Sequence, residues 1–208
     1  MQFTHLIAEI SNPYSSEEDV IKLIDLGLHL PLKGVSIPGY WVKKVCRDLH
    51  GSDLIIQSCI GEGNGNQLTQ VKLFELQQLI KLGVNEVASV LNVGAFRTNP
   101  TWCKIECLQL AQTAHKDEVL FTLKLPPIDF TNSEIIEICS LANKAGVDTL
   151  FIHQEHLIYM DNINQNLSSD IEKQIHIYDT NLLTETLFEN FQTVNITYDQ
   201  INPDVNVS

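Results

Sequence analysis

The sequence predicts an α/β protein of the (β/α)8 TIM-barrel class, small for that fold and with its final helix truncated or missing. Three observations support this prediction. Eight strand-like segments alternate with about seven helix-like segments, several of the helices end at a glycine, and 208 residues is near the lower limit for such a barrel. A doubly wound open sheet is the alternative. No interior linker is visible, so residues 1–208 are interpreted as one domain.

The first half of the chain opens with the strand-like run "THLIAEI". The segment "SSEEDVIKLIDLG" reads as a helix with a capping box from Ser15 to Glu18 and an end at Gly27. Strand "GVSIP", helix "YWVKKVCRDL" and strand "DLIIQSCI" follow. The long helix "NQLTQVKLFELQQLIKLG" is then closed by Gly83, and "EVASVLNV" is the next strand.

The second half continues the alternation, with helix "WCKIECLQLAQTA" and strand "EVLFTLKL". The helix "TNSEIIEICSLANKAG" has a capping box from Thr131 to Glu134 and ends at Gly146. After strand "DTLFIH" we expect a helix around "SSDIEKQ", then strand "IHIYD", helix "LLTETLFEN" and strand "TVNITY". The tail "DQINPDVNVS" cannot supply a closing helix. In a barrel, functional groups gather at the C-terminal ends of the strands, so we expect a site at those ends.

Composition and charge argue against several classes of function. The net charge is −13, and residues 151–208 hold nine acidic residues against one basic residue, which argues against nucleic acid and against an anionic substrate bound there. No apolar run is long enough to predict a membrane span, and the N-terminus does not resemble a secretory signal. Five cysteines in apolar or helical contexts favour reduced thiols and a cytoplasmic location.

One stretch resembles a known family. The run "CIGEGNGNQLTQVKLFELQQLIKLGVNEVASVLNVGA" is similar to the deoxyribose-phosphate aldolase pattern V-I-G-F-P-L-G-x-x-x-T-x-x-K-x-x-E followed by G-A-D-E-I-D-M-V-I-N-I-G-A. The likeness covers about residues 16–153 and weakens beyond them. Residues shared without a gap are Gly61, Gly65, Thr69, Lys72, Glu75, Gly83, Glu86, Asn92, Gly94 and Ala95.

That resemblance implies a lyase that joins acetaldehyde to glyceraldehyde 3-phosphate through a lysine Schiff base, without a cofactor or metal. The family's reactive residues are not matched here. Phe151 stands at the Schiff-base lysine and Ala88 at the catalytic aspartate. The relay lysine falls near Ile177, and the two phosphate-binding glycines fall on Thr180 and Asn181. The sequence therefore predicts that the family's own chemistry is lost.

Lys124 is the best remaining candidate for a catalytic amine. It lies two residues beyond the family's strand-five lysine position, so it faces the same side, nearer the end of the strand. In a dry barrel mouth its pKa would fall, which would make it nucleophilic. The alternative is a lysine paired to a carboxylate such as Glu62 or Glu155.

Other polar residues are candidates for a ligand pocket. His153 and Glu155 lie near the end of the same strand, and a structural role or a pocket lining is favoured over a metal site with His156. Phe151 is interpreted as a plug of the core. The Gly61–Gly65 run resembles a phosphate loop only in its glycines, since Glu62 and the lack of a nearby lysine argue against phosphate. The predicted pocket comprises Asn92, Glu62, Phe151, His153 and Glu155.

Two functional hypotheses follow. The first is an aldolase-like barrel without the family's activity, serving as a binding, regulatory or assembly protein, with a small molecule at its mouth and a homodimer as its assembly. The second is an altered aldehyde-lyase that uses Lys124 as the amine, acting on 2-deoxyribose 5-phosphate or a related substrate.

Overall fold

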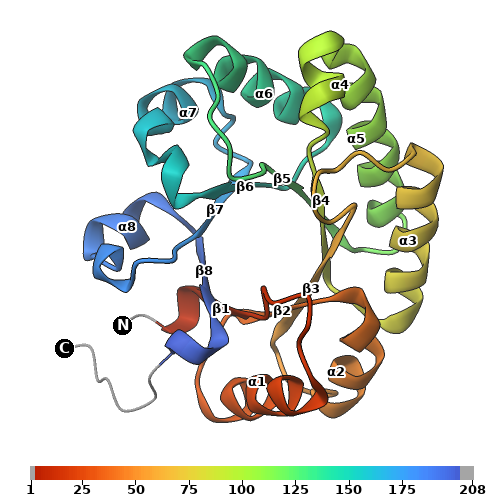
Figure 1. Ribbon diagram of the computed structural model, residues 1–208, viewed down its shortest axis with the longest axis vertical. Coiled ribbons are helices and arrows are strands. Elements are labelled where there is room, and N and C mark those ends of the chain that lie inside the picture. The colour runs from red at the N-terminus through yellow and green to blue at the C-terminus, as the bar shows by residue number, and fades with distance from the viewer. Residues whose placement is uncertain (1–2, 202–208) are drawn as a thin grey trace.

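The computed structural model describes residues 3–201, which form one closed barrel of eight parallel strands in sequence order with helices outside it (Figure 1). Each strand pairs with the next, and β8 pairs with β1 to close the ring. The predicted (β/α)8 fold class is confirmed. The strands are β1 (Leu6–Glu9), β2 (Gly34–Ile37), β3 (Ile55–Ile60), β4 (Glu86–Val90), β5 (Leu120–Lys124), β6 (Thr149–His153), β7 (Glu172–His176) and β8 (Thr193–Thr197).

The helices pack their apolar sides on the outer face of the barrel, and this layer forms the main hydrophobic core. They are α1 (Glu17–His29), α2 (Val42–Asp48), α3 (Thr69–Leu82), α4 (Val93–Thr98), α5 (Pro100–His115), α6 (Asn132–Ala145), α7 (Met160–Asn166) and α8 (Glu185–Asn190). Gly83 and Gly146 end α3 and α6 in the left-handed conformation, as the sequence predicts, because glycine has no Cβ to oppose it.

The first helix differs from its prediction at both ends. Its capping box joins Ser16 to Asp19, one residue later than predicted, and the Ser16 backbone N–H donates to the Asp19 carboxylate over 2.7 Å. The helix runs on past Gly27 to His29. Gly27 is therefore an interior position, and its small size serves packing, because a Cβ there would lie 2.9 Å from Leu54 Cδ1.

The prediction of a helix around "SSDIEKQ" is wrong. The segment is a turn that leads into β7, whose bounds are Glu172–His176 instead of the predicted "IHIYD", and the helix before it is α7. A short 3-10 helix, Gln154–Tyr159, joins β6 to α7. The error has a physical cause: Gln174 and His176 are buried polar side chains, so the strand lacks the apolar signature that identifies a buried strand from sequence.

Two further differences lie at strand ends. The predicted strand "EVASVLNV" stops at Val90, and α4 begins soon after it with the Asn92 side chain accepting from the Ala95 backbone N–H as a helix cap. At the end of the described residues, the chain leaves β8 through a 3-10 helix, Tyr198–Gln200. The prediction that the final helix is missing falls largely on residues 202–208, which lie outside the described residues.

The interior of the barrel is unusually polar for this fold, where branched apolar side chains normally fill the space. A hydrogen-bonded chain crosses it from one carboxylate to another. Asn195 Nδ2 donates to Glu9 Oε2 over 2.7 Å, and Gln174 Nε2 donates to Asn195 Oδ1 over 2.6 Å. Gln57 Nε2 donates to Gln174 Oε1 over 3.2 Å and to Glu86 Oε1 over 2.9 Å. These five buried residues are called the polar spine.

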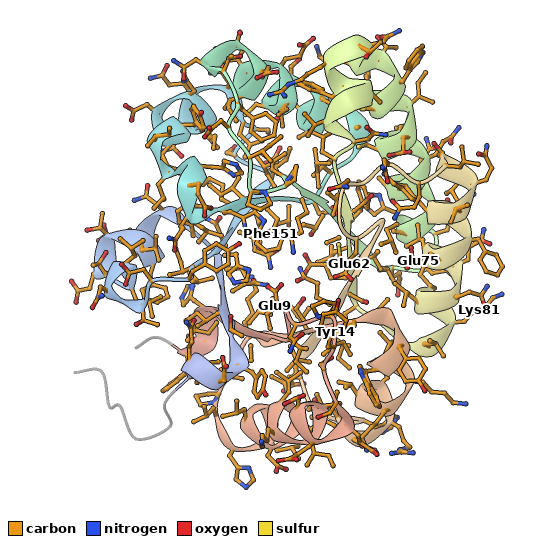
Figure 2. All side chains as sticks on the ribbon, viewed as in Figure 1. Glu9, Tyr14, Glu62, Glu75, Lys81 and Phe151 are labelled. Atoms are coloured by element: carbon orange, nitrogen blue, oxygen red, sulfur yellow. The ribbon has the colours of Figure 1, made fainter. Side chains whose placement is uncertain are left out.

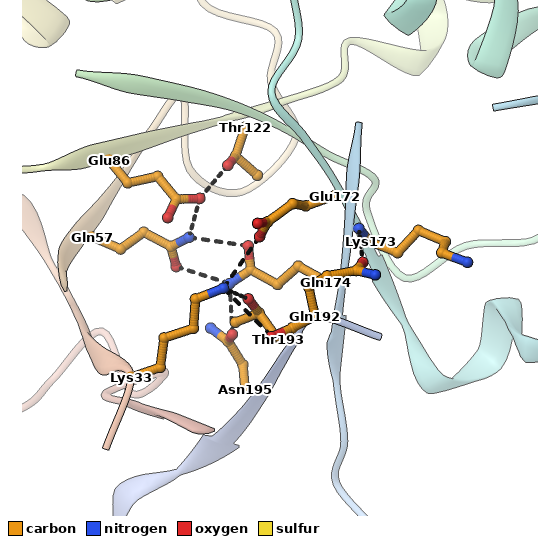
Figure 3. A network of polar contacts seen from close by, with 10 residues as sticks. All are labelled: Lys33, Gln57, Glu86, Thr122, Glu172, Lys173, Gln174, Gln192, Thr193 and Asn195. Carbon is orange, nitrogen blue, oxygen red and sulfur yellow. Dashed lines mark hydrogen bonds and ion pairs between the residues drawn. The ribbon is translucent and has the colours of Figure 1, made fainter. Parts of the chain in front are cut away.

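Figure 3 shows the Glu86 end of the polar spine. Glu86 is the first residue of β4, so this end lies toward the N-terminal side of the barrel. Glu86 also accepts a hydrogen bond from the Thr122 hydroxyl. Nearby, Lys33 Nζ donates to Thr193 Oγ1 over 2.5 Å and pairs with Glu172 over 3.1 Å. Burial raises the pKa of the Glu86 carboxyl, against the opposing effect of its two hydrogen bonds. Side chains from β3, β4, β5, β7 and β8 thus satisfy one another inside the barrel.

Candidate functional site at the barrel mouth

A cavity of about 440 Å³ opens at the C-terminal ends of the strands, where barrel enzymes carry their sites. Figure 2 places Phe151, Glu9 and Glu62 around the barrel axis in this region. Loops and strand ends contribute both apolar and polar side chains. The lining residues are Ser11, Pro13, Cys59, Glu62, Gly63, Val90, Lys124, Leu125, Pro126, Pro127 and His153.

Lys124, the last residue of β5, points into this cavity and is held by two groups. Its Nζ lies 3.7 Å from Glu9 Oε1 and 4.5 Å from the centre of the Phe151 ring. Burial acts to lower the pKa of Lys124, but Glu9 and other nearby acidic groups outweigh it, so the pKa is raised. The expected lowering of this pKa is therefore wrong, and the carboxylate partner is Glu9 instead of Glu62 or Glu155.

Glu9 ends β1 and joins the mouth to the polar spine. The same carboxylate pairs with Lys124, lies 3.4 Å from His176 Nδ1 through Oε2, and accepts from Asn195. Burial acts to raise the pKa of Glu9, whereas Lys124, His176 and the Asn195 hydrogen bond lower it, and the lowering prevails. Glu9 was not among the site residues predicted from the sequence. The available signal was a carboxylate that ends the otherwise apolar run "LIAE".

Three aromatic side chains stack beside Lys124 at the ends of β6 and β7. The His153 and His176 rings lie 5.7 Å apart, and His153 Nδ1 is 2.6 Å from the Tyr178 hydroxyl. Both histidines are nearly fully buried, and neither Nε2 atom has a hydrogen-bond partner among the described residues. Burial lowers the pKa of His153 to about 3 and also lowers that of His176. Both rings are consequently neutral near pH 7, with one nitrogen free. We call Glu9, Lys124, His153, His176 and Tyr178 the mouth cluster.

The two positions that the resemblance assigns to the catalytic lysine and aspartate are filled by apolar side chains. Phe151 is 1% exposed, pairs in register with Lys124, and stacks on His153 with ring centres 5.7 Å apart. Ala88 is equally buried on β4, in register between Cys59 and Thr122. Neither side chain can form an imine or accept a proton. Ile177, near which the relay lysine was expected, packs in the outer hydrophobic core, whereas its neighbour His176 belongs to the mouth cluster.

The predicted pocket residues separate into two groups. Glu62 and His153 line the cavity with Lys124, and Phe151 lies beneath them in contact with Lys124 and His153. Asn92 instead caps α4, and Glu155 is exposed on the 3-10 helix and does not line the cavity. Its neighbour His156 has a structural role, because it accepts from the His153 backbone N–H and its Nε2 lies 3.0 Å from the Ile128 carbonyl oxygen.

The glycine-rich loop after β3 is held by residues shared with the resembled family. Gly65 approaches β4 so closely that a Cβ would lie 2.3 Å from the Val90 carbonyl oxygen. A lysine does lie beside this loop, contrary to expectation: Lys72 packs under Gly61. However, its Nζ is fully buried and pairs with Glu106 over 2.6 Å. Lys72 therefore anchors the loop from below and is not available to a ligand phosphate.

The structure gives little support for thiol or metal chemistry at the mouth. Burial raises the pKa of the Cys59 thiol to about 12, so this cavity-lining cysteine stays protonated and unreactive. All five cysteines have free thiols. Within residues 3–201, no group of three His, Cys, Asp or Glu side chains is arranged to hold a metal ion. Over the same residues, no helix is both long and apolar enough to cross a membrane.

The fold and the site together define a (β/α)8-barrel protein with a polar, partly open mouth. Comparison with curated proteins identifies its relatives. The chain is 30% identical over 139 residues to a deoxyribose-phosphate aldolase of Bacillus cytotoxicus and 31% identical over 140 residues to one of Bacillus mycoides. Each match covers 67% of this chain and 62% of the relative's length. This protein is a member of the deoxyribose-phosphate-aldolase-like family.

Solved structures agree on the fold. An aldolase named QR15 matches with a TM-score of 0.81 and 16% identity, covering 94% of this chain and 91% of that one. The deoxyribose phosphate aldolase of Aeropyrum pernix, described as tetrameric, matches with a TM-score of 0.79 and 13% identity, covering 93% and 85%. No protein-family profile matches the chain. At these identities the structural likeness shows the barrel alone.

Proposed function

We propose that this protein is an aldolase-like barrel that binds a small molecule at its mouth without the family's Schiff-base catalysis, and that it serves a regulatory or assembly role. One observation carries the proposal: a buried phenylalanine, Phe151, stands where the resemblance places the nucleophilic lysine. The neighbouring amine, Lys124, is held as an ammonium by Glu9. An ammonium has no lone pair with which to attack a carbonyl.

The remaining contacts support binding in preference to catalysis. The cavity of about 440 Å³ is within the range of small-molecule sites. Its lining combines apolar side chains with Lys124, Glu62 and His153, whose Nε2 has no hydrogen-bond partner within residues 3–201. Imine chemistry also requires a proton relay, and Ala88 provides none at the position of the family's aspartate.

A second candidate function is a lyase that uses Lys124 as its amine. The observation in its favour is that Lys124 pairs in register with Phe151, so an amine lies one strand away from the family's nucleophile position. Glu9, which pairs with Lys124, offers a carboxylate, and His176, which lies beside Glu9, offers a neutral imidazole; these are groups that proton transfer requires.

Borohydride trapping tests the proposal against this alternative. The protein is incubated with acetaldehyde or 2-deoxyribose 5-phosphate, reduced with borohydride, and analysed by intact and peptide mass spectrometry. We expect no covalent adduct under conditions that label an active deoxyribose-phosphate aldolase. An adduct on Lys124 that is absent from Lys124→Arg would overturn the proposal in favour of the lyase, because arginine keeps the charge but cannot form the imine.

The assembly role is proposed to involve a homodimer. The helices α3 and α5 are neighbours on the outside of the barrel (Figure 1). They expose Phe74 and Trp102, which are 64% and 58% accessible, together with Val71 and Ile105. Light scattering coupled to size-exclusion chromatography should give the mass of a dimer, and Phe74→Glu should shift it to that of a monomer. Lys22→Glu on α1, a helix that does not carry this patch, is the control and should leave the mass unchanged.

A further inference from the structure

The charges around the mouth cavity oppose one another. Among the described residues that line the cavity, Lys124 carries a positive charge and Glu62 carries a negative charge. Glu9 already offsets the Lys124 charge. Although Glu62 is exposed as a residue, desolvation at the cavity wall raises the pKa of its carboxyl group. A phosphate entering this cavity would meet two carboxyl groups and one paired ammonium, so it would gain little attraction.

In contrast, polar groups at the cavity can still form further hydrogen bonds. His153 is 4% exposed, and its Nε2 has no partner among the described residues. Its Nδ1 is engaged by the Tyr178 hydroxyl, which fixes the ring in place. The Lys124 Nζ is 3.7 Å from its carboxylate, beyond hydrogen-bond distance, so the contact with Glu9 leaves its N–H groups able to donate to a ligand. Buried polar atoms of this kind normally have partners, and a ligand would supply them.

Another part of the cavity lining is apolar. Val90, Leu125 and the Pro126–Pro127 pair, which follows β5, contribute to it. A ligand that matches this mixed lining needs both a hydrocarbon surface and hydroxyl or carbonyl oxygens. Sugars and their open-chain aldehydes have this amphipathic character, and a pentose or hexose is small enough for a cavity of about 440 Å³.

We propose that the mouth binds an uncharged polyhydroxylated carbonyl compound, an unphosphorylated sugar, with its oxygens on Lys124 and on His153 Nε2. This inference rests on the proposed function, because it names the ligand class of the same cavity. Lys124 donates to a carbonyl or hydroxyl oxygen, and His153 Nε2 completes its hydrogen bonding with a second hydroxyl. Glu62 at the rim disfavours the phosphorylated form of the same sugar.

Ligand-observed NMR titration with 2-deoxyribose and with 2-deoxyribose 5-phosphate tests this inference. We expect the unphosphorylated sugar to bind at least about fivefold more tightly, since like charges in contact oppose the phosphate. Equal or tighter binding of the phosphorylated sugar would overturn the proposed ligand class, and so would a lack of binding by both. These titrations are independent of borohydride trapping. The titrations test which ligand binds, whereas trapping tests whether the protein forms an imine, so the two proposals can fail separately.

Two variants with matched controls locate the contacts. His153→Phe keeps an aromatic ring in the stack and removes both ring nitrogens, the Nε2 without a partner among the described residues and the Nδ1 that lies 2.6 Å from the Tyr178 hydroxyl, so affinity for 2-deoxyribose should fall by at least about fivefold, the value of one neutral hydrogen bond. His29→Phe, at an exposed position on α1, should leave it unchanged. Glu62→Gln should narrow the difference between the two sugars, whereas Glu155→Gln, outside the cavity lining, should not. Unchanged 2-deoxyribose affinity in folded His153→Phe would overturn the assignment.

Discussion

The polar spine and the mouth cluster are both buried, polar and built from strand side chains, yet they differ in how completely their groups are paired. Each member of the spine from Asn195 to Glu86 has a hydrogen-bond partner on another strand. In the mouth cluster, His153 and His176 each have one buried nitrogen without a hydrogen-bond partner in the described part of the chain, and the Lys124 Nζ lies beyond hydrogen-bond distance of Glu9. A fully paired network contributes rigidity, whereas unpaired buried groups mark a place where a ligand can add contacts.

Phe151 lies between these two regions, and its substitution should cause the largest change in the free energy of unfolding. Phe151→Ala would leave a cavity under Lys124 and remove the stacking on His153, at a cost of about 3–5 kcal/mol in the free energy of unfolding. Urea denaturation monitored by circular dichroism measures this change. A loss below about 1 kcal/mol would contradict tight packing between the spine and the mouth.

The centre of the spine should be the next most sensitive position. Gln174→Leu leaves Asn195 Oδ1 and a Gln57 N–H without partners inside the barrel, which should cost about 2–4 kcal/mol. Tyr178→Phe at the mouth removes one hydroxyl from a partly exposed ring and should cost about 1 kcal/mol or less. If the two variants lose equal stability in parallel denaturation experiments, the contrast between paired spine and open mouth is wrong.

Glu9→Gln should destabilise the protein at pH 7 by about 2 kcal/mol, because Lys124 loses its carboxylate. The folded pKa of Glu9 lies below its ordinary value of 4.5. The carboxylate therefore contributes stability above pH 4.5, and this contribution is lost as the pH falls through the folded pKa. Denaturation measured from pH 7 to pH 3 should show the variant converging on the wild type at low pH. A constant difference across that range would contradict the ion pair.

Glu86→Gln should cause the smallest change in the free energy of unfolding, and its pH dependence should have the opposite sign to that of Glu9→Gln. Burial raises the folded pKa of Glu86, so its favourable contribution is complete below pH 4.5 and is lost as the pH rises through the folded pKa. A glutamine can keep its oxygen on Gln57 and Thr122, and should be neutral or stabilising by up to about 1 kcal/mol at pH 7. The same pH series checks this result, and marked destabilisation at pH 7 would show that the spine requires a charge.

Much of the barrel was predictable because its outer layer obeys simple periodicity. Gly83, Gly146 and the Thr131 capping box each act locally, so the sequence identified them in place. Prediction failed at β7, where Gln174 and His176 are polar and buried. Their environment is created by β3, β6 and β8, which are distant in sequence, and hydrophobic patterning cannot detect a strand whose inward side chains are polar.

Prediction of the site was partial for a similar reason. Lys124 and His153, which the sequence placed at strand ends, line the mouth cavity, whereas Asn92 caps α4 and Glu155 lies outside the cavity lining. The sequence did not identify Glu9, whose partners on β5, β7 and β8 lie far along the chain. Spacing within one segment reveals which face a side chain shares, but not which side chains meet across a closed barrel.

The sequence by itself determined the alternating strands and helices, the helix caps, the likeness to an aldolase family, and the presence of Phe151 and Ala88 where that likeness expects a lysine and an aspartate. Only the tertiary structure decided the state of Lys124. Closing the barrel brings β1 opposite β5 and places the Glu9 carboxylate beside the amine. A pKa depends on charges and solvent in three dimensions, and that arrangement exists only after the ring has closed.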